Sequence, residues 1–476
     1  MRADAGPPDT RALGRAERSL TPAVAAPRVC SRSLAPRGLL AVGAAVAALA
    51  AGGYLAALAA HPLAVTLKGF DLQVYLGGAR QALRHPGALY SWSYDGHPGI
   101  QFTYTPFAAL LFAAGLAVPL RALMAAVTVV SVLALGATVS VAFRALGWRG
   151  IPRLGATLLV AGLALWTEPV QRALFLGQVE LVLMALVTWD LCQPDGRRWK
   201  GAATGLAAGL KLVPLLFLGY LLVTGRFRQA GAGLAAFAVT VAVGWAALPA
   251  ASVRWWLGGD FVAAGRTGFV GGQQNQSLRG LVTRLAGSVH GGELPWLLLA
   301  LAAGALGLAA AAALYRGGRP LAGLVTCALT ALLVSPVSWD HHWVWVAPGF
   351  ALAADAAARA AGRARAGWLA LAAGLCAVFG AWPDFWSRQA GLLGGGLINY
   401  APATAWAYGD NPAYREYHWH ALQLLAGNAE ILAGLALFAL LLITAARTSR
   451  LHGAHTGRRQ PLSGRYRTHF HDREGF

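Results

Sequence analysis

The feature that most constrains this chain is a repeated series of apolar runs, many of them close to the length that crosses a lipid bilayer. A spanning helix needs about 20 consecutive apolar residues. Only 12% of the residues are charged, whereas soluble domains average about 25%. A soluble fold could not bury so many apolar segments. The sequence therefore indicates an all-α, polytopic (multi-pass) membrane protein.

The apolar runs predict twelve membrane segments. Their approximate limits are 38–60, 122–143, 154–167, 174–192, 201–210, 212–225, 229–248, 295–315, 320–334, 343–358, 367–382 and 421–446. Two of them are too short to span alone, and we expect them to pair as a hairpin around Lys211. Residues 106–120 are also apolar, but Pro106, Pro119 and Arg121 favour a helix that lies in the outer interface.

The chain divides into one apolar domain and two polar tails. Residues 38–446 hold every predicted membrane segment, whereas 1–37 and 447–476 are rich in Arg, Pro and Gly and are predicted to be disordered. A net charge of +20 could indicate nucleic-acid binding, but the basic residues are spread over short loops and tails. We therefore expect membrane lipids, and no nucleic acid, as partners.

The distribution of Lys and Arg predicts the orientation in the cell membrane. With the N-terminus inside, 27 of the 39 basic residues fall in inner segments and 12 in outer ones. Inner loops of membrane proteins carry the basic excess, so this arrangement favours two cytoplasmic termini. Loops 61–103, 249–294 and 383–420 are then extracytoplasmic.

The predicted outer face concentrates acids, amides, histidines and aromatic rings. Its candidate site residues are Asp71, Tyr75, Arg172, Gln178, Lys211, Asn275, Gln276, Arg279, Asp340, His341 and His342. Aromatic rings stack on the apolar faces of sugars, while amides and carboxylates bind sugar hydroxyls, so the set predicts a sugar-binding cleft. An aromatic belt with ordinary helix caps would explain Trp and Tyr residues. It would not explain the Asp-His-His run at 340–342.

Several short motifs stand in order between residues 68 and 350. They are Asp71 to Tyr75, Ala88-Leu89-Tyr90, Phe102 to Leu110, Leu176 to Leu181, Trp199-Lys200-Gly201, Leu210 to Pro214, Asn275 to Leu278 and Ser335 to Trp343. Together they resemble glycosyltransferase family 87, the polyprenol-phosphate-mannose-dependent mannosyltransferases of actinobacteria, which have the GT-C fold. The chain departs from the usual pattern at Glu180, where Asn is common, and at Thr105, where Pro is common.

The resemblance implies a GT-C-type helix bundle with a catalytic first outer loop. It also implies an extracytoplasmic reaction, in which mannose passes from a polyprenyl-phosphate-mannose donor to a hydroxyl of a lipid-anchored glycan. The β-linked sugar would be transferred with inversion to an α-linkage, often α-1,2. The expected activity is that of an α-mannosyltransferase, one of the hexosyltransferases.

The residue types suit inverting transfer, which needs a base beside the acceptor hydroxyl. We expect Asp71 to be that base, with a helix cap as its alternative role. A lysine between short apolar segments is costly in a membrane, so we expect Lys211 to bind the donor phosphate rather than snorkel to the headgroups. Arg172 and Arg279 are further candidates for the phosphate. Tyr75, Gln178, Asn275 and Gln276 are expected to bind substrate.

His341 and His342 are expected to bind the phosphate or to orient Asp71, with only one of the two facing the site. A metal site built from Asp340, His341 and His342 is disfavoured, because adjacent residues rarely supply three ligands, and no metal or other cofactor is expected. The competing function is a sugar or lipid transporter or flippase without transferase chemistry. A membrane scaffold subunit without activity is a third alternative, in which Asp71 would be replaceable.

Overall fold

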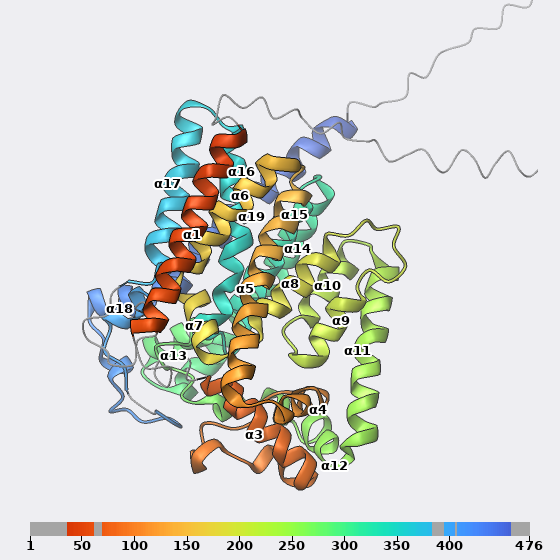
Figure 1. The fold of residues 1–476 in the computed structure, drawn as a ribbon, viewed down its shortest axis with the longest axis vertical. Coiled ribbons are helices and arrows are strands. Elements are labelled where there is room, and N and C mark those ends of the chain that lie inside the picture. Colours follow the sequence, from red (N-terminus) through yellow and green to blue (C-terminus); the bar gives the residue numbers. More distant parts are fainter. Residues whose placement is uncertain (1–35, 61–68, 383–394, 405–406, 458–476) are drawn as a thin grey trace, which may run out of the picture.

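The computed structural model describes residues 36–60, 69–382, 395–404 and 407–457 as a bundle of helices (Figure 1). Across these ranges the only β-structure consists of isolated bridges such as Ser93 with Gln101. The all-α prediction is therefore confirmed. The predicted tails fall largely outside the described residues, although helix α19 (Ala429–Gly457) covers the first part of the C-terminal one.

Five helices of the described chain are long and apolar enough to cross a membrane. They are α1 (Pro36–Ala60), α5 (Leu120–Ala145), α11 (Phe227–Ala247), α14 (Val289–Arg316) and α19. A sixth candidate span is a bent pair, α7 (Glu168–Leu176) and α8 (Glu180–Leu191), whose axes differ by 117°. These helices support a multi-pass membrane protein.

The other predicted membrane segments form shorter helices, so twelve full spans are not supported. They are α6 (Gly150–Leu165), α9 (Ala202–Leu210), α10 (Leu215–Val223), α15 (Pro320–Val334), α16 (Val346–Arg359) and α17 (Gly362–Phe379). The predicted segment 421–446 contains the short α18 (Ala421–Gly427) and the first part of α19. A helix of nine residues, such as α9, extends only about 14 Å at 1.5 Å per residue. The hydropathy of the sequence predicted where these helices lie. The residues at which each helix ends depend on tertiary contacts and could not be predicted in the same way.

The segment after α1 forms a separate layer at one end of the bundle (Figure 1). It contains α3 (Phe70–Arg84), η2 (Pro86–Ser91), η3 (Tyr94–Gly96), α4 (Pro106–Ala113) and η4 (Ala114–Ala117). Thr105 caps α4, because its hydroxyl oxygen accepts a hydrogen bond from the Ala108 amide at 3.1 Å. Residues 106–120 thus start with a short capped helix, and Pro106–Ala117 is shorter than the helices that are long enough to cross a membrane.

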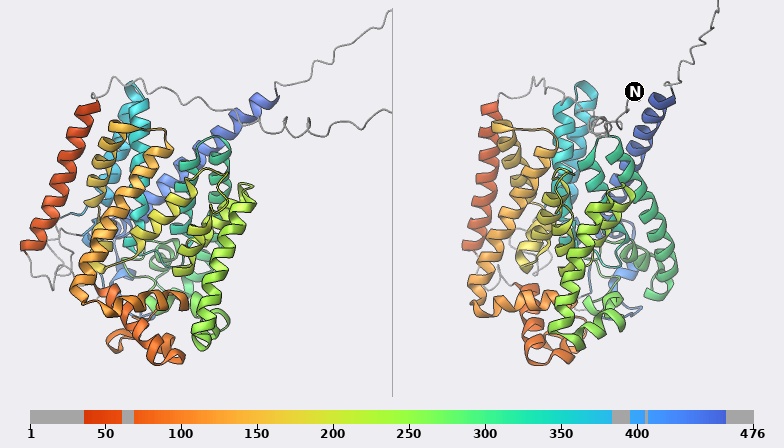
Figure 2. Two further views of the ribbon diagram at one scale, coloured as in Figure 1. Left: turned by 45° about the vertical axis from the view of Figure 1, so that its right-hand side comes forward. Right: turned by 90° about the vertical axis from the view of Figure 1, so that its right-hand side faces the viewer.

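The remaining short elements join the long helices. They are α12 (Pro249–Ser252), η5 (Val253–Leu257), η6 (Asp260–Val262), η7 (Ala264–Thr267), α13 (Leu278–Ala286), η8 (Asp340–Trp345), η9 (Leu397–Tyr400) and η10 (Arg415–His418). Figure 2 shows that the start of α1 and the end of α19 lie at the end of the bundle opposite α3 and α4. At that opposite end the turn after α5 contacts the end of α16, where Arg359 Nη2 donates a hydrogen bond to the Leu146 carbonyl at 2.8 Å.

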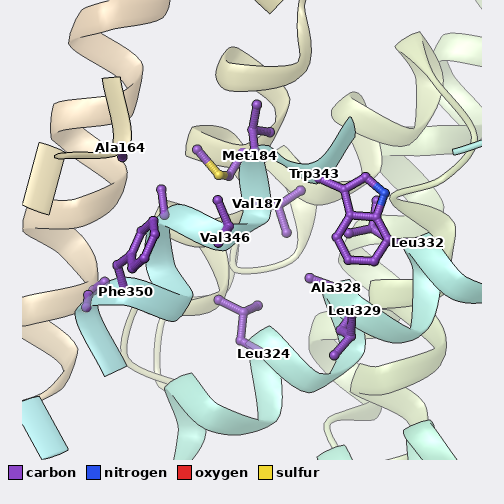
Figure 3. Close-up of a cluster of buried hydrophobic side chains, with 14 of the residues drawn as sticks. Ala164, Met184, Val187, Leu324, Ala328, Leu329, Leu332, Trp343, Val346 and Phe350 are labelled. Carbon is purple, nitrogen blue, oxygen red and sulfur yellow. The ribbon is translucent and has the colours of Figure 1, made fainter. Parts of the chain in front are cut away.

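A core of large apolar side chains fixes η8 and α16 against α8 and α15 (Figure 3). Trp343 follows the Asp-His-His run directly and is 2% exposed. Its ring packs on α19 at Gly434, where a Cβ atom would lie 2.3 Å from the ring. Burying a large apolar side chain contributes about 1.5–3 kcal/mol. The packing of Trp343 therefore anchors the two histidines that precede it.

Candidate active site

A cavity of about 430 Å³ opens where α3, α7, η8 and the break between α9 and α10 meet. Ligand sites typically have volumes of about 300–1,000 Å³. Eight of the site residues predicted from the sequence line this cavity, namely Asp71, Tyr75, Arg172, Gln178, Lys211, Asp340, His341 and His342. They come from four segments that are far apart in the sequence.

Two glycines bring Asp71 and Gln178 together. Gly69 has φ 54° and precedes α3, and Gly177 has φ 71° and ends α7, so both adopt the left-handed backbone conformation that favours glycine. The Gly69 amide donates to the Phe175 carbonyl at 3.1 Å. A Cβ atom on Gly177 would lie only 2.9 Å from Cβ of Leu72. The first turn of α3 and the end of α7 can approach this closely only because both positions lack a side chain.

The Gln178 side-chain amide connects a residue of α3 to a residue of η8. Its Nε2 atom donates to Asp71 Oδ2 at 2.5 Å and lies 3.0 Å from His341 Nε2. Its Oε1 atom accepts hydrogen bonds from the hydroxyls of Tyr75 and of Tyr104, the latter at 3.3 Å. An amide offers two N–H donors and two acceptor lone pairs, so all four are engaged. Gln178 therefore holds the carboxylate and the imidazole in fixed positions.

The position of Asp71 makes its carboxylate more basic than usual. Burial raises the pKa of Asp71, and the neighbouring His341, Gln178 and Lys211 offset only part of this effect. The side chain still faces the cavity. A carboxylate with a raised pKa is suited to take a proton from a hydroxyl near neutral pH.

Asp340 and Arg172 orient His341. The His341 Nδ1 atom lies 3.1 Å from Asp340 Oδ1, and Arg172 Nε lies 3.6 Å from Asp340 Oδ2. Burial raises the pKa of Asp340, but the bond with His341 and the charge of Arg172 outweigh it and leave the pKa below the usual value. An ionised Asp340 accepts a hydrogen bond from the Nδ1–H group of His341. The proton of the neutral imidazole is then on Nδ1, so Nε2 accepts the hydrogen bond from Gln178.

Lys211 also lines the cavity and is already paired. Its ammonium group forms an ion pair with Glu180 and lies 2.9 Å from His342 Nε2. Burial lowers the pKa of His342 far below its usual value, and the charge of Lys211 adds to the effect. His342 is therefore a neutral imidazole that accepts a hydrogen bond from Lys211.

Both histidines line the cavity, so the expectation that only one of them faces it was wrong. The rings meet edge to face, with centroids 4.7 Å apart. Adjacent side chains diverge around η8, but each ring has its own partner in the cavity: Gln178 contacts His341, and Lys211 contacts His342.

One group of described residues has ligand atoms spaced for a metal ion. It consists of Glu180, His341 and His342, whose ligand atoms lie within 4.8 Å of one another. Lys211 bonds to two of these same ligands. In this arrangement the ammonium group supplies the positive charge that a cation would bring to Glu180.

Comparisons with known proteins place the chain in a family. The sequence pattern of glycosyltransferase family 87 matches residues 102–336. A polyprenol-phosphate-mannose-dependent α-(1-2)-phosphatidylinositol pentamannoside mannosyltransferase of Mycobacterium tuberculosis (strain CDC 1551 / Oshkosh) is 35% identical over 310 residues, which cover 63% of this chain and 70% of the relative. This chain belongs to glycosyltransferase family 87. It is therefore an enzyme, a membrane-embedded glycosyltransferase.

Further members of glycosyltransferase family 87 show the same relationship. A protein of the same name from Mycolicibacterium smegmatis is 37% identical over 286 residues, which cover 58% of this chain and 67% of the relative. A phosphatidylinositol mannoside mannosyltransferase of Mycobacterium tuberculosis H37Rv, with the same donor dependence, is 33% identical over 294 residues, or 58% and 68% of the two chains. No solved structure matches this member of the family.

Three predicted site residues of this glycosyltransferase lie outside the cavity lining. Asn275 Nδ2 donates to the Val270 carbonyl at 2.8 Å, and Gln276 Nε2 donates to the Gly427 carbonyl at 2.8 Å. Arg279 lies 3.5 Å from Glu293. The two amides thus hold a loop whose Gln274 carbonyl accepts from the Asp340 amide at 2.9 Å, and so they act on the position of η8.

Two residues that were not predicted from the sequence as site residues also belong to the site, Tyr104 in the cavity lining and Glu180 as the partner of Lys211. Tyr104 bonds to Tyr75, with 2.7 Å between the hydroxyls, and its ring lies below the Lys211 ammonium group. Glu180 neutralises Lys211. The departure from the family pattern at Glu180 was a signal, because a carboxylate at a membrane edge usually has a cationic partner.

Proposed function

We propose that this protein transfers mannose from a polyprenyl-phosphate-mannose donor to a hydroxyl of a lipid-anchored glycan, with inversion to an α-1,2 linkage. The names of its relatives support this donor and a phosphatidylinositol mannoside as acceptor. The observation that carries the proposal is that a half-buried carboxylate, Asp71, and the Lys211 ammonium group line the same cavity. Base and cation are thus both available in one cavity.

In the proposed reaction Asp71 takes the proton of the acceptor hydroxyl. The hydroxyl oxygen forms a bond to C1 of mannose, and the bond from C1 to the phosphate oxygen breaks with its electron pair on that oxygen. Attack from the face opposite the phosphate converts a β-linkage to an α-linkage. Gln178 and His341 keep Asp71 in place through the contacts described above. A general base of this kind contributes about 10²–10⁴-fold in rate.

The leaving phosphate needs positive charge more than it needs a proton donor. Lys211 supplies this charge in the proposal, with Arg172 as a second cation at the cavity wall. Oriented cations in an enclosed site stabilise charge that develops in the transition state. Glu180 keeps the lysine ionised before the donor arrives, because the ion pair opposes the effect of burial and raises the pKa of Lys211.

Tyr75 and Tyr104 hold the Gln178 side chain in place through hydrogen bonds to its Oε1 atom. Burial holds the pKa of Tyr75 well above its usual value, so its hydroxyl stays protonated and donates to Gln178. In the proposal Tyr75 and Gln178 shape the sugar-binding part of the cavity. Asn275, Gln276 and Arg279 act on substrate through the loop that they stabilise.

The proposal places the active site at the extracytoplasmic face, with both termini in the cytoplasm. The basic residues gather at the end of the bundle opposite α3 and α4, which supports this orientation. We further propose a GT-C-type arrangement, in which short helices such as α9 and α10 complete a bundle of about twelve membrane segments. A transporter would share the bent α7–α8 pair, but membership in a glycosyltransferase family favours transfer chemistry.

The direct test is an assay with purified protein, radiolabelled polyprenyl-phosphate-mannose and a phosphatidylinositol mannoside. The expected product is a lipid heavier by one hexose, from which an α-mannosidase releases the label. An identical reaction without acceptor is the control for donor hydrolysis. Donor binding without any labelled glycolipid, in a protein that is folded and tested with several mannoside acceptors, would contradict the proposal.

A further inference from the structure

A second cavity lies away from the active site, between the transmembrane helices α5 and α8. Its volume is about 400 Å³, which falls in the range of about 300–1,000 Å³ typical of ligand sites. The lining is entirely apolar and consists of Ala137, Val141, Val182, Ala185, Leu186 and Trp189. We call these six residues the α5–α8 groove. The proposed reaction does not use them.

The groove follows one stripe along each of its two helices. On α8 the positions 182, 185, 186 and 189 repeat at the spacing of one helix face, and on α5 the positions 137 and 141 are one turn apart. Other α8 side chains, including Met184 and Val187, turn into the core (Figure 3). The groove thus occupies the side of α8 that the bundle leaves open, and two alanines make it hollow.

Stacked indole rings and positive charge mark one end of the groove. Trp189 stacks on Trp199, with ring centroids 5.1 Å apart, and the Arg197 guanidinium lies 5.2 Å from the Trp199 ring centroid. On α5, Arg144 follows Val141 by three residues and therefore continues the same helix face. Arg144 and Arg197 are both exposed. An apolar trough therefore ends beside two exposed guanidinium groups.

This charged end lies away from the active site. Glu180 begins α8 at the catalytic cavity, and Trp189 is nine residues further on, about 13 Å along the helix axis. Tryptophan and arginine side chains at helix ends favour the boundary between lipid chains and headgroups. The groove itself then lies at the depth of the acyl chains, with its charged end at headgroup level.

We propose that the α5–α8 groove binds an acyl chain of an anionic phospholipid whose headgroup contacts Arg144 and Arg197. Basic sites between transmembrane helices bind anionic lipid headgroups, and the apolar lining fits a hydrocarbon chain. A neutral lipid would fill the groove without using the two cations. The polyprenyl chain of the donor fits less well, because its phosphate belongs beside Lys211 in the other cavity. The proposal is independent of the transfer reaction.

The test compares two lipids with identical chains, dioleoyl phosphatidylglycerol and dioleoyl phosphatidylcholine, added to the purified full-length protein in neutral detergent. We expect phosphatidylglycerol to raise the unfolding midpoint by about 2 °C or more beyond phosphatidylcholine, because a ligand that binds only the folded state stabilises it. Native mass spectrometry should show one retained phosphatidylglycerol molecule per chain.

Two kinds of variant separate the groove from the general membrane surface. Ala185→Phe fills the groove, and Arg144→Gln with Arg197→Gln removes the charge, so each should abolish the difference between the two lipids. The matched control is Arg363→Gln with Arg365→Gln, which removes two exposed arginines of α17 at the same end of the bundle. If Ala185→Phe fails to fold, the smaller change Ala137→Leu takes its place.

Equal stabilisation by the two lipids would overturn the proposal, as would a phosphatidylglycerol effect that survives both groove variants. A lipid effect lost equally in the α17 control would reduce the site to general surface charge and would also overturn it. Polyprenyl phosphate retained in place of phosphatidylglycerol, and lost in Ala185→Phe, would assign the groove to the donor chain instead.

Discussion

Gln178 Nε2 lies 2.5 Å from Asp71 Oδ2 and 3.0 Å from His341 Nε2, so one amide nitrogen links the proposed base to the histidine beside it. Asp71 and Gln178 can meet because Gly69 and Gly177, which lie close to them in the chain, approach each other closely. Asp71 therefore depends on Gln178 for its orientation and for part of the control of its pKa.

Replacing Gln178 tests this dependence. Gln178→Leu removes four hydrogen bonds, and each buried polar group left unpaired costs about 1–3 kcal/mol. We expect kcat to fall by about 10–100-fold, in line with misplacement of a general base. Donor KM should change little, because Lys211 remains in place.

Gln178→Glu tests the same contact through pH. The added carboxylate repels the negative charge of Asp71 and raises the pKa of that group further. Transfer requires ionised Asp71, so kcat/KM falls as the pH drops through this pKa. The acidic limb of the pH profile should therefore move to higher pH in Gln178→Glu than in the native protein. An unchanged limb would contradict the assignment of that limb to Asp71.

Lys211 and Glu180 should be changed together as well as singly. Lys211→Met leaves a largely enclosed carboxylate without its partner, so lost stability would obscure the kinetics. The double variant Lys211→Met with Glu180→Gln removes both charges and should fold. We expect the donor KM of the double variant to rise by at least about tenfold if the cation binds phosphate. An unaltered donor KM and kcat would return Lys211 to a structural role.

The topology predicts which positions are reached from outside the cell. In a background without native cysteines, cysteines at Gly87 and at His290, both exposed, should react with a membrane-impermeant maleimide on intact cells. A cysteine at Gly196, exposed in the turn between α8 and α9, should react only after permeabilisation. The reverse pattern would invert the orientation of the active site.

Packing between Gly434 and Trp343 predicts a stability effect. A methyl group at Gly434 would meet the Trp343 ring, so Gly434→Ala should destabilise the protein by about 1–3 kcal/mol. Gly374→Ala on α17 is the control, because its Cβ would meet nothing within 4 Å. Thermal unfolding of the two variants measures the difference. Equal midpoints would show that the ring moves aside without cost.

The apolar runs of the sequence predicted the all-α membrane class. Much of the candidate site could also be predicted, because charged and amide side chains at a membrane edge are costly unless they have a function. The sequence could not predict the contacts of Gln178, which depend on two glycines that meet across 108 residues of chain. Nor could it separate the amides of Asn275 and Gln276, which bond to backbone carbonyls, from the amide of Gln178. All three are polar residues in predicted outer segments, and only tertiary structure distinguishes them.

Helix length was the other property that the sequence did not predict. The apolar runs on either side of Lys211 have the composition of membrane segments, yet α9 and α10 contain nine residues each. At Lys211 the backbone is extended, with φ −140° and ψ 132°. The break is tied to the ion pair with Glu180, 31 residues earlier in the chain, so it depends on a non-local contact.

Mannosyl transfer by Asp71→Asn distinguishes a general base at this position from a carboxylate with a structural role. The asparagine keeps the size of the side chain but cannot take a proton, so we predict a variant that folds and binds donor with unchanged affinity. Its rate of transfer to a phosphatidylinositol mannoside should fall by about 10²–10⁴-fold. Near-native transfer by a folded Asp71→Asn protein would contradict the assignment of Asp71 as the base, because the reaction would then have another base.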